Sequence, residues 1–212
     1  GEVKTLMIGV RNNSDEVKSG EVWVNELRLL EHNNKGGWAA NANLNVQLSD
    51  LGSVNATGRY MSEGFGGLED GVASRSTDNY GSYSVTTSLE MGKFFPDKAK
   101  VSIPLYYSVT KEKTSPKYNP LDTDMELKDA LDAAGSKAER DSIENIAVTK
   151  VTQTNFSVSN ARVGIATRRH PMPYDPANFS FTYSHAHQHT TGETTVFENR
   201  DNWRGALDYS WT

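Results

Sequence analysis

The sequence predicts a mainly β protein whose antiparallel strands form part of a large transmembrane β-barrel, with a helical loop insertion and an N-terminal β-sandwich-like remnant. Three observations support this fold class. Apolar and polar side chains alternate along six segments, and these segments are about 8–12 residues long, close to the length that crosses a bilayer at a tilt. Small uncharged polar residues are also abundant: Asn, Ser and Thr number 17, 20 and 18 among 212 residues.

The composition excludes several classes of protein. The formal net charge is -5, and the chain has no dense Lys/Arg cluster, so a nucleic-acid partner is not expected. There is no cysteine, which excludes a disulfide scaffold, a cysteine zinc site and thiol chemistry. No run of about 18 apolar residues is present, so membrane-spanning helices are not expected.

Residues 1–33 are expected to be the end of a preceding β-rich domain. Strands are predicted at residues 3–10 and 21–30. In the second of these, Val24 lies on one face and Trp23 on the other, so both faces are partly apolar. This pattern favours burial inside a sandwich over exposure of one face to lipid.

Residues 38–110 are predicted to form barrel strands in two hairpins, and residues 179–212 to return to the barrel. Alternate positions of the first strand carry Asn while Leu44 and Val46 lie on the other face. The predicted strands are residues 38–48, 53–61, 83–91, 99–110, 179–184 and 202–211. The candidates for lining a water-filled pore are Asn41, Asn43, Asn45, Ser82, Ser84 and Thr86.

Two architectures share this alternation: a transmembrane barrel and a soluble or surface β-sandwich that binds glycan or protein. Strand length, neutral polar faces and aromatic residues near strand ends favour the barrel. These aromatic residues are Trp38, Tyr60, Tyr83, Tyr107, Trp203, Tyr209 and Trp211. In the sandwich alternative, Trp23, Trp38, Trp203 and Trp211 would provide stacking platforms.

Residues 111–178 are predicted to be one long loop with helices at about 123–134 and 137–146. The insertion is expected to be a plug, a cap or a docking element, or alternatively a solvent-exposed excursion without a partner. Its candidates for docking a partner or cap are Leu127, Leu131 and Ile143. Whether residues 151–163 form a further barrel strand, and which side of the membrane the insertion faces, both stay open.

Side chains that could support chemistry are sparse. His185, His187 and His189 share one face of a predicted strand and are weak candidates for binding Zn, Ni or Cu. Successive histidines would lie about 7 Å apart on an ideal strand, which is too far for one metal to bind all three easily. The alternative places them at the level of the lipid headgroups or beyond. No catalytic, metal-binding or cofactor-binding residue is assigned, and the protein is not expected to be an enzyme.

Three sequence blocks resemble the SprA/Sov family, the outer-membrane translocon of type IX secretion. The first is GEVWVNELRL at residues 20–29, and the second is YNPLDTD at residues 118–124 with its continuation through residue 143. The third is YDPANF at residues 174–179, followed by NWRG at residues 202–205. Because members of this family are far larger, the chain is expected to be a fragment.

The resemblance implies a very large barrel in the bacterial outer membrane that exports folded proteins and supports gliding motility. Its implied partners are secreted cargo proteins, gating and plug proteins of the outer membrane, and the lipid bilayer. It implies no cofactor and no catalytic residue. The polar strand faces would line the pore, and the apolar faces would contact lipid.

Overall fold

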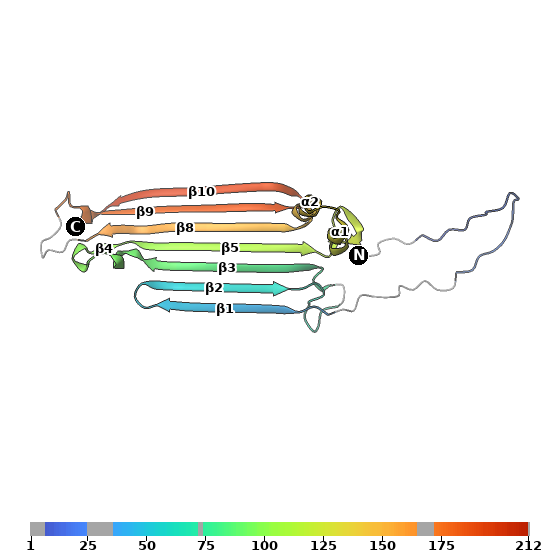
Figure 1. Cartoon of the computed structure of the whole chain (residues 1–212), viewed down its shortest axis with the longest axis horizontal. Helices are drawn as coiled ribbons and strands as arrows, with labels where there is room; N and C mark the ends of the chain where they lie inside the picture. Colours follow the sequence, from blue (N-terminus) through green and yellow to red (C-terminus); the bar gives the residue numbers. More distant parts are fainter. Residues whose placement is uncertain (1–6, 25–35, 72–73, 165–171, 212) are drawn as a thin grey trace.

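The computed structural model describes residues 7–24, 36–71, 74–164 and 172–211. Its main feature is one antiparallel sheet of eight strands, seen face-on in Figure 1, with two short helices at one end. Seven strands follow one another in the order β1-β2-β3-β5-β8-β9-β10, and the short β4 pairs with β8. Neighbours in this order are also successive long strands in the chain, so each turns back beside the one before it.

The strands are long, as expected from the alternation. Their bounds are β1 Ala39–Leu48, β2 Gly52–Met61, β3 Asp78–Glu90, β4 Val101–Ser102, β5 Pro104–Pro116, β8 Thr149–Val163, β9 Phe179–Gly192 and β10 Thr195–Tyr209. Short 3-10 turns lie between β3 and β4, at Met91–Phe94 and Asp97–Ala99, and before β9 at Pro176–Asn178. Gly52 has a φ of 149°, and a Cβ there would lie 1.9 Å from the Ser88 carbonyl oxygen, so the start of β2 requires glycine.

The helical insertion connects β5 to β8. It begins with the small hairpin of β6 (Tyr118–Asn119) and β7 (Asp122–Glu126), and continues with α1 (Leu127–Ala133) and α2 (Lys137–Ala147). Ser136 caps α2, because its hydroxyl accepts a hydrogen bond from the Glu139 amide. Among the described residues, no helix is long and apolar enough to cross a membrane.

The buried apolar residues lie in the insertion, not in the sheet. In the described part of the chain, the apolar residues classed as buried are Leu127, Ala130, Ala147 and Val148. The sheet is a single layer, and no second sheet packs face to face on it within the described ranges. The packing expected for the sandwich alternative is therefore not found there.

Most predicted strands are confirmed, but several boundaries were wrong. The predicted loop at residues 111–178 contains the end of β5 and the whole of β8, so residues 149–163 form a strand of the sheet. The segment predicted as one strand at residues 99–110 is split between β4 and β5. β9 continues through the histidines to Gly192, and a two-residue turn replaces the longer loop expected before β10.

The helix predicted at residues 123–134 starts later, at Leu127. Asp122 and its neighbours pair with β6 instead, and the Asn119 side chain accepts a hydrogen bond from the Leu121 amide inside this hairpin. The helix predicted at residues 137–146 is confirmed as α2.

Residues 7–24 project away from the sheet beyond its helical end in Figure 1 and have no regular secondary structure. The parts of the expected strands 3–10 and 21–30 that fall in this range are therefore not strands. The remainder of both lies outside the described residues. The assignment of residues 1–33 to a preceding domain stays a prediction.

Candidate functional site: the two faces of the sheet

One face of the sheet carries a continuous polar surface. All six candidates for pore lining lie on it, because Arg59, Thr57 and Asn55 of β2 connect each Asn of β1 to its counterpart on β3. A row of directly paired residues crosses all seven long strands without an apolar side chain. This row is Asn43, Thr57, Ser84, Thr110, Gln153, Gln188 and Arg200.

Side chains on this polar face bind one another across strands. Ser84 and Thr110 share a hydrogen bond of 2.9 Å between their hydroxyls. In the next row, the Asn155 amide donates to the Ser108 hydroxyl at 3.1 Å. These contacts fix hydroxyls and amides at the surface without adding net charge. A wide surface of this kind offers water many hydrogen-bond donors and acceptors and presents little apolar area.

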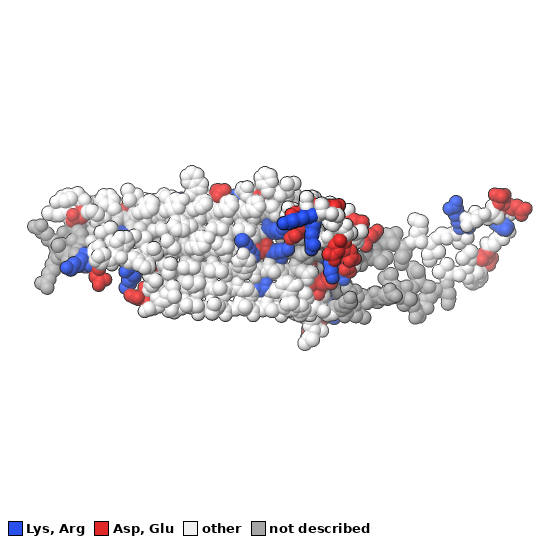
Figure 2. All heavy atoms as spheres, viewed as in Figure 1, with Lys and Arg blue, Asp and Glu red and all other residues white. Residues whose placement is uncertain are grey.

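The opposite face carries an apolar belt. We use this name for the apolar side chains on that face, from Trp38 just before β1 to Trp203 and Tyr209 on β10. Nothing among the described residues covers most of it: Leu44 is 60% exposed, Leu207 69% and Trp203 77%. Figure 2 shows that the middle of the sheet is largely uncharged, while charged residues lie at both ends and are most numerous at the end with the helices. An apolar area of this extent is unusual for a surface in water.

Aromatic residues mark the edge of the belt that faces the helical end. They are Trp38 just before β1, Tyr60 on β2, Tyr83 on β3, Tyr107 on β5, Phe156 on β8, Tyr183 on β9 and Trp203 on β10. Neighbouring rings contact each other: the centroids of Trp38 and Tyr60 are 4.6 Å apart, and those of Phe156 and Tyr183 are 6.2 Å apart. The sequence indicated aromatic strand ends, but only the pairing shows that they form one line.

This line is not perpendicular to the strands. Trp203 lies in the same row as Val46, whereas Trp38 lies eight residues from Val46 along β1. The other edge of the belt shifts in the same direction. It ends at Leu48 on β1 and at Tyr209 on β10. Leu48 shares its row with Gly205, and Tyr209 lies four residues beyond Gly205. Over six strand-to-strand steps the belt therefore shifts by about one residue per strand.

The three histidines lie on the apolar face: His185 shares a row with Phe156 and Trp203 of the aromatic line, and His187 and His189 lie beyond it. They bind β10, because His185 and His187 both contact the Asp201 carboxylate, at 3.2 and 2.8 Å, and His189 contacts Asn199. No group of three or more His, Cys, Asp or Glu side chains in the described residues is arranged to hold a metal ion. The placement of these histidines at the level of the lipid headgroups stays a prediction.

The docking candidates of the insertion pack on one another. Leu127 is 3% exposed and lies in a cluster with Ala147 and Val148, and Leu131 and Ile143 pack against this cluster. The apolar stripe therefore stabilises the insertion itself, and Leu127 presents no side chain to a partner in this conformation. Docking of a partner on the insertion stays a prediction.

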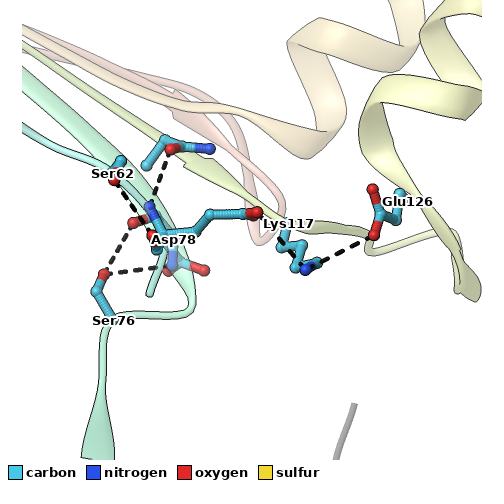
Figure 3. A network of polar contacts seen from close by, with 7 residues as sticks. Ser62, Ser76, Asp78, Lys117 and Glu126 are labelled. Carbon is cyan, nitrogen blue, oxygen red and sulfur yellow. Dashed lines mark hydrogen bonds and ion pairs between the residues drawn. The ribbon is translucent and has the colours of Figure 1, made fainter. Parts of the chain in front are cut away.

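A buried lysine connects the insertion to the β2–β3 loop. The Lys117 ammonium lies 3.5 Å from Glu63 and 3.6 Å from Glu126, and only 14% of its side chain is exposed (Figure 3). The same loop is fixed to the start of the sheet, because the Ser62 hydroxyl accepts a hydrogen bond from the Trp38 amide at 2.8 Å. The two long connections at this end thus form one ordered structure.

Sequence reasoning missed a group of charged residues beyond the aromatic line. Lys111 and Lys113 continue β5, and Lys150 on β8 lies directly opposite Lys113. Glu144 of α2 contacts both Lys113, at 2.9 Å, and Lys150, at 3.4 Å. The hydrogen bond from Lys113 holds the pKa of the Glu144 carboxyl below its usual range. The alternation of Lys, Glu and Lys at residues 111–113 was the available signal that the strand continues.

Residues 1–131 match the SprA_N family, described as a motility related/secretion protein. The chain belongs to this family. The match covers the strands from β1 to β7 and the start of α1, so it includes half of the polar face and of the aromatic line. Membership associates the chain with secretion, motility and the cell envelope. A search of curated proteins finds no match to this chain.

Proposed function

We propose that this SprA_N sheet is part of the wall of a protein-conducting β-barrel in the bacterial outer membrane, through which folded proteins are exported in type IX secretion and on which gliding motility depends. The apolar belt contacts lipid, and the polar face lines a water-filled pore. The proposed role is passage and not catalysis. Gating and plug proteins are the proposed partners of the complete pore.

The observation that carries this proposal is the oblique aromatic edge of the belt. A shift of about one residue per strand, at about 3.3 Å per residue and 4.8 Å between strands, corresponds to a tilt of roughly 35°. Strands of transmembrane barrels are tilted by about the same angle, so a horizontal membrane slab crosses them obliquely. A soluble sheet packed on another sheet has no reason to show a tilted aromatic boundary.

The two faces also fit opposite solvents. Lipid accepts the exposed Leu, Val, Trp and Phe side chains without the cost that water imposes. The polar row from Asn43 to Gln188 is neutral and ends at Arg200, which pairs with Glu198, and it favours a wet lumen. Such a lumen suits a folded cargo protein, because it provides neither a large apolar surface nor a strong field of one sign.

The test uses the absence of cysteine from the chain, which makes single cysteines specific reporters. In cells that secrete normally, Asn43→Cys, Ser84→Cys and Thr110→Cys should react with a membrane-impermeant maleimide. Leu44→Cys and Val85→Cys, from the neighbouring row inside the belt, should react only with a lipid-soluble reagent. Equal labelling of the two sets by the impermeant reagent would contradict the proposal.

A second measurement addresses transport itself. Replacing Asn43 or Ser84 with Trp should reduce secretion while leaving insertion into the outer membrane unchanged, since the bulky side chain narrows the pore. Normal secretion from several such variants would count against a pore-lining role.

A further inference from the structure

The structure assigns a ligand site to the hollow beyond the aromatic line: we propose that Lys111, Lys113 and Lys150 bind the phosphate of an anionic lipid headgroup. This inference rests on the proposed function, because it requires the belt to lie in a bilayer. It adds a specific lipid contact that the wall of a barrel does not need by itself.

The strand pairing brings the three ammonium groups together. Lys113 and Lys150 are direct cross-strand partners, and Lys111 lies two residues from Lys113 on the same face of β5. Direct partners are about 5 Å apart at the backbone, and positions two apart about 7 Å. Lysine side chains are long and flexible enough to converge on a single phosphate from these positions.

The charges of the group do not cancel. Two lysines directly opposite each other repel, and Glu144 offsets this repulsion by contacting both. Lys111 makes no side-chain hydrogen bond or ion pair in the described part of the chain. The other acid on the described strands of this face, Asp201, lies three strands away and binds two histidines. Arg59 and Glu112 also line the hollow and offset each other in charge, so two positive charges remain for a ligand.

The hollow next to these lysines has an apolar side. It has a volume of about 750 Å³, and its lining includes Tyr60, Gly81 and Tyr83 together with the three lysines. Gly81 is the direct cross-strand partner of Tyr60 and lies two residues from Tyr83 on β3, so it adds no side chain between the two rings. Tyrosine at the belt edge next to lysine matches the boundary between acyl chain and headgroup.

This arrangement favours a lipid over a free anion. A phosphate ion would use the lysines alone, whereas a phospholipid also places its glycerol and upper acyl carbons against Tyr60 and Tyr83. Charged residues gather at this end of the sheet and at the opposite end, and the middle of the face between them is largely uncharged (Figure 2). The hollow is therefore at the level where a lipid phosphate would lie.

The experiment is native mass spectrometry of the protein, expressed from its whole reading frame and purified in detergent, titrated with phosphatidylglycerol. The variant Lys111→Gln/Lys113→Gln/Lys150→Gln should lower the affinity for this lipid about tenfold or more, because it removes the uncompensated charge. The matched control Lys128→Gln/Lys137→Gln/Arg140→Gln removes three exposed cations of the insertion and should leave the affinity unchanged. Glu144→Gln should raise it, since both partner lysines become available.

The outcomes separate the explanations. Unchanged binding by the triple variant, or an equal loss in the control, would overturn the site. Competition by 10 mM inorganic phosphate as effective as that of the lipid would identify a free-anion site and overturn the lipid assignment. Cysteine labelling distinguishes the two failures: if the belt still labels as lipid-exposed while the triple variant binds lipid normally, only this inference fails.

Discussion

The sheet and the helical insertion use their apolar residues in opposite ways. The insertion buries Leu127, Ala147 and Val148 against one another and forms a small core of its own. The sheet is much larger, yet its apolar side chains stay exposed, with Leu44 at 60% and Trp203 at 77%. The insertion therefore buries its own apolar side chains, as an element in water does. The sheet leaves its apolar side chains exposed, as expected for an element in contact with an apolar environment such as lipid.

The difference also appears in how the backbone is stabilised. In the sheet, every long strand except the two at the edges is hydrogen-bonded on both sides, so the ladder satisfies the backbone without help from packing. The edge strands β1 and β10 present unpaired groups within the described residues, which favours continuation of the sheet on both sides. The insertion depends instead on side-chain contacts, including Lys117 between two acids.

The largest effect is expected from a charge placed in the belt. Val85→Lys should destabilise the folded protein in a bilayer by about 2–4 kcal/mol, because the ammonium must enter lipid. Thr86→Lys, the adjacent residue on the polar face, should cost less than about 1 kcal/mol. Folding into vesicles, followed by the mobility shift between folded and unfolded protein, measures both. Equal costs would remove the distinction between the faces.

A smaller and local effect is expected in the insertion. Leu127→Ala should destabilise the packing of α1 on α2 by about 2–3 kcal/mol, since a buried side chain is removed from a small cluster. Amide hydrogen exchange should increase in α1 and α2 and stay unchanged in β3 and β5. The exposed neighbour substitution Lys128→Ala provides the control and should alter neither region. Faster exchange throughout the sheet would show that the two regions are not independent.

The smallest effect concerns pH at the junction between the two regions. Because the pKa of Glu144 is lowered from its ordinary value of 4.5, its contribution is fully present above that value. It is lost as the pH falls through the folded-state pKa, which lies below 4.5. The change should be under about 1 kcal/mol, since the pairs with Lys113 and Lys150 are partly exposed.

Hydrogen exchange of α2 between pH 6 and pH 3 measures this effect, after correction for the intrinsic rate. The Glu144→Gln variant should show no such dependence. If protection of α2 in the protein without substitutions increased on acidification, Glu144 would not stabilise α2 in its ionised form, and the prediction would be wrong.

Several elements could be predicted because a local pattern defines them. The alternation of Asn41, Asn43 and Asn45 with Leu44 and Val46 placed β1 and its two faces, and Ser136 before Glu139 placed α2. The six pore-lining candidates were found on one face for the same reason. Each of these depends on side chains close together in the sequence.

Other elements could not be predicted because distant partners define them. The run at residues 111–116 carries two lysines on the face that is apolar earlier in β5, so its pattern indicated a loop. It continues the strand because β3 and β8 pair with it on both sides. Likewise a helix was expected to start at about residue 123, but Asp122–Glu126 pairs with β6 and the helix starts at Leu127.

The sequence by itself determined the period of two, and with it which residues share a face of the sheet. It also determined the family, through blocks that span most of the chain. Only the tertiary structure decided the register between strands, because the period of two is satisfied equally by every shift of two residues. That register turns scattered aromatic residues into one oblique line and brings Lys111, Lys113 and Lys150 beside it, which is the geometry from which the membrane tilt and the lipid site are inferred.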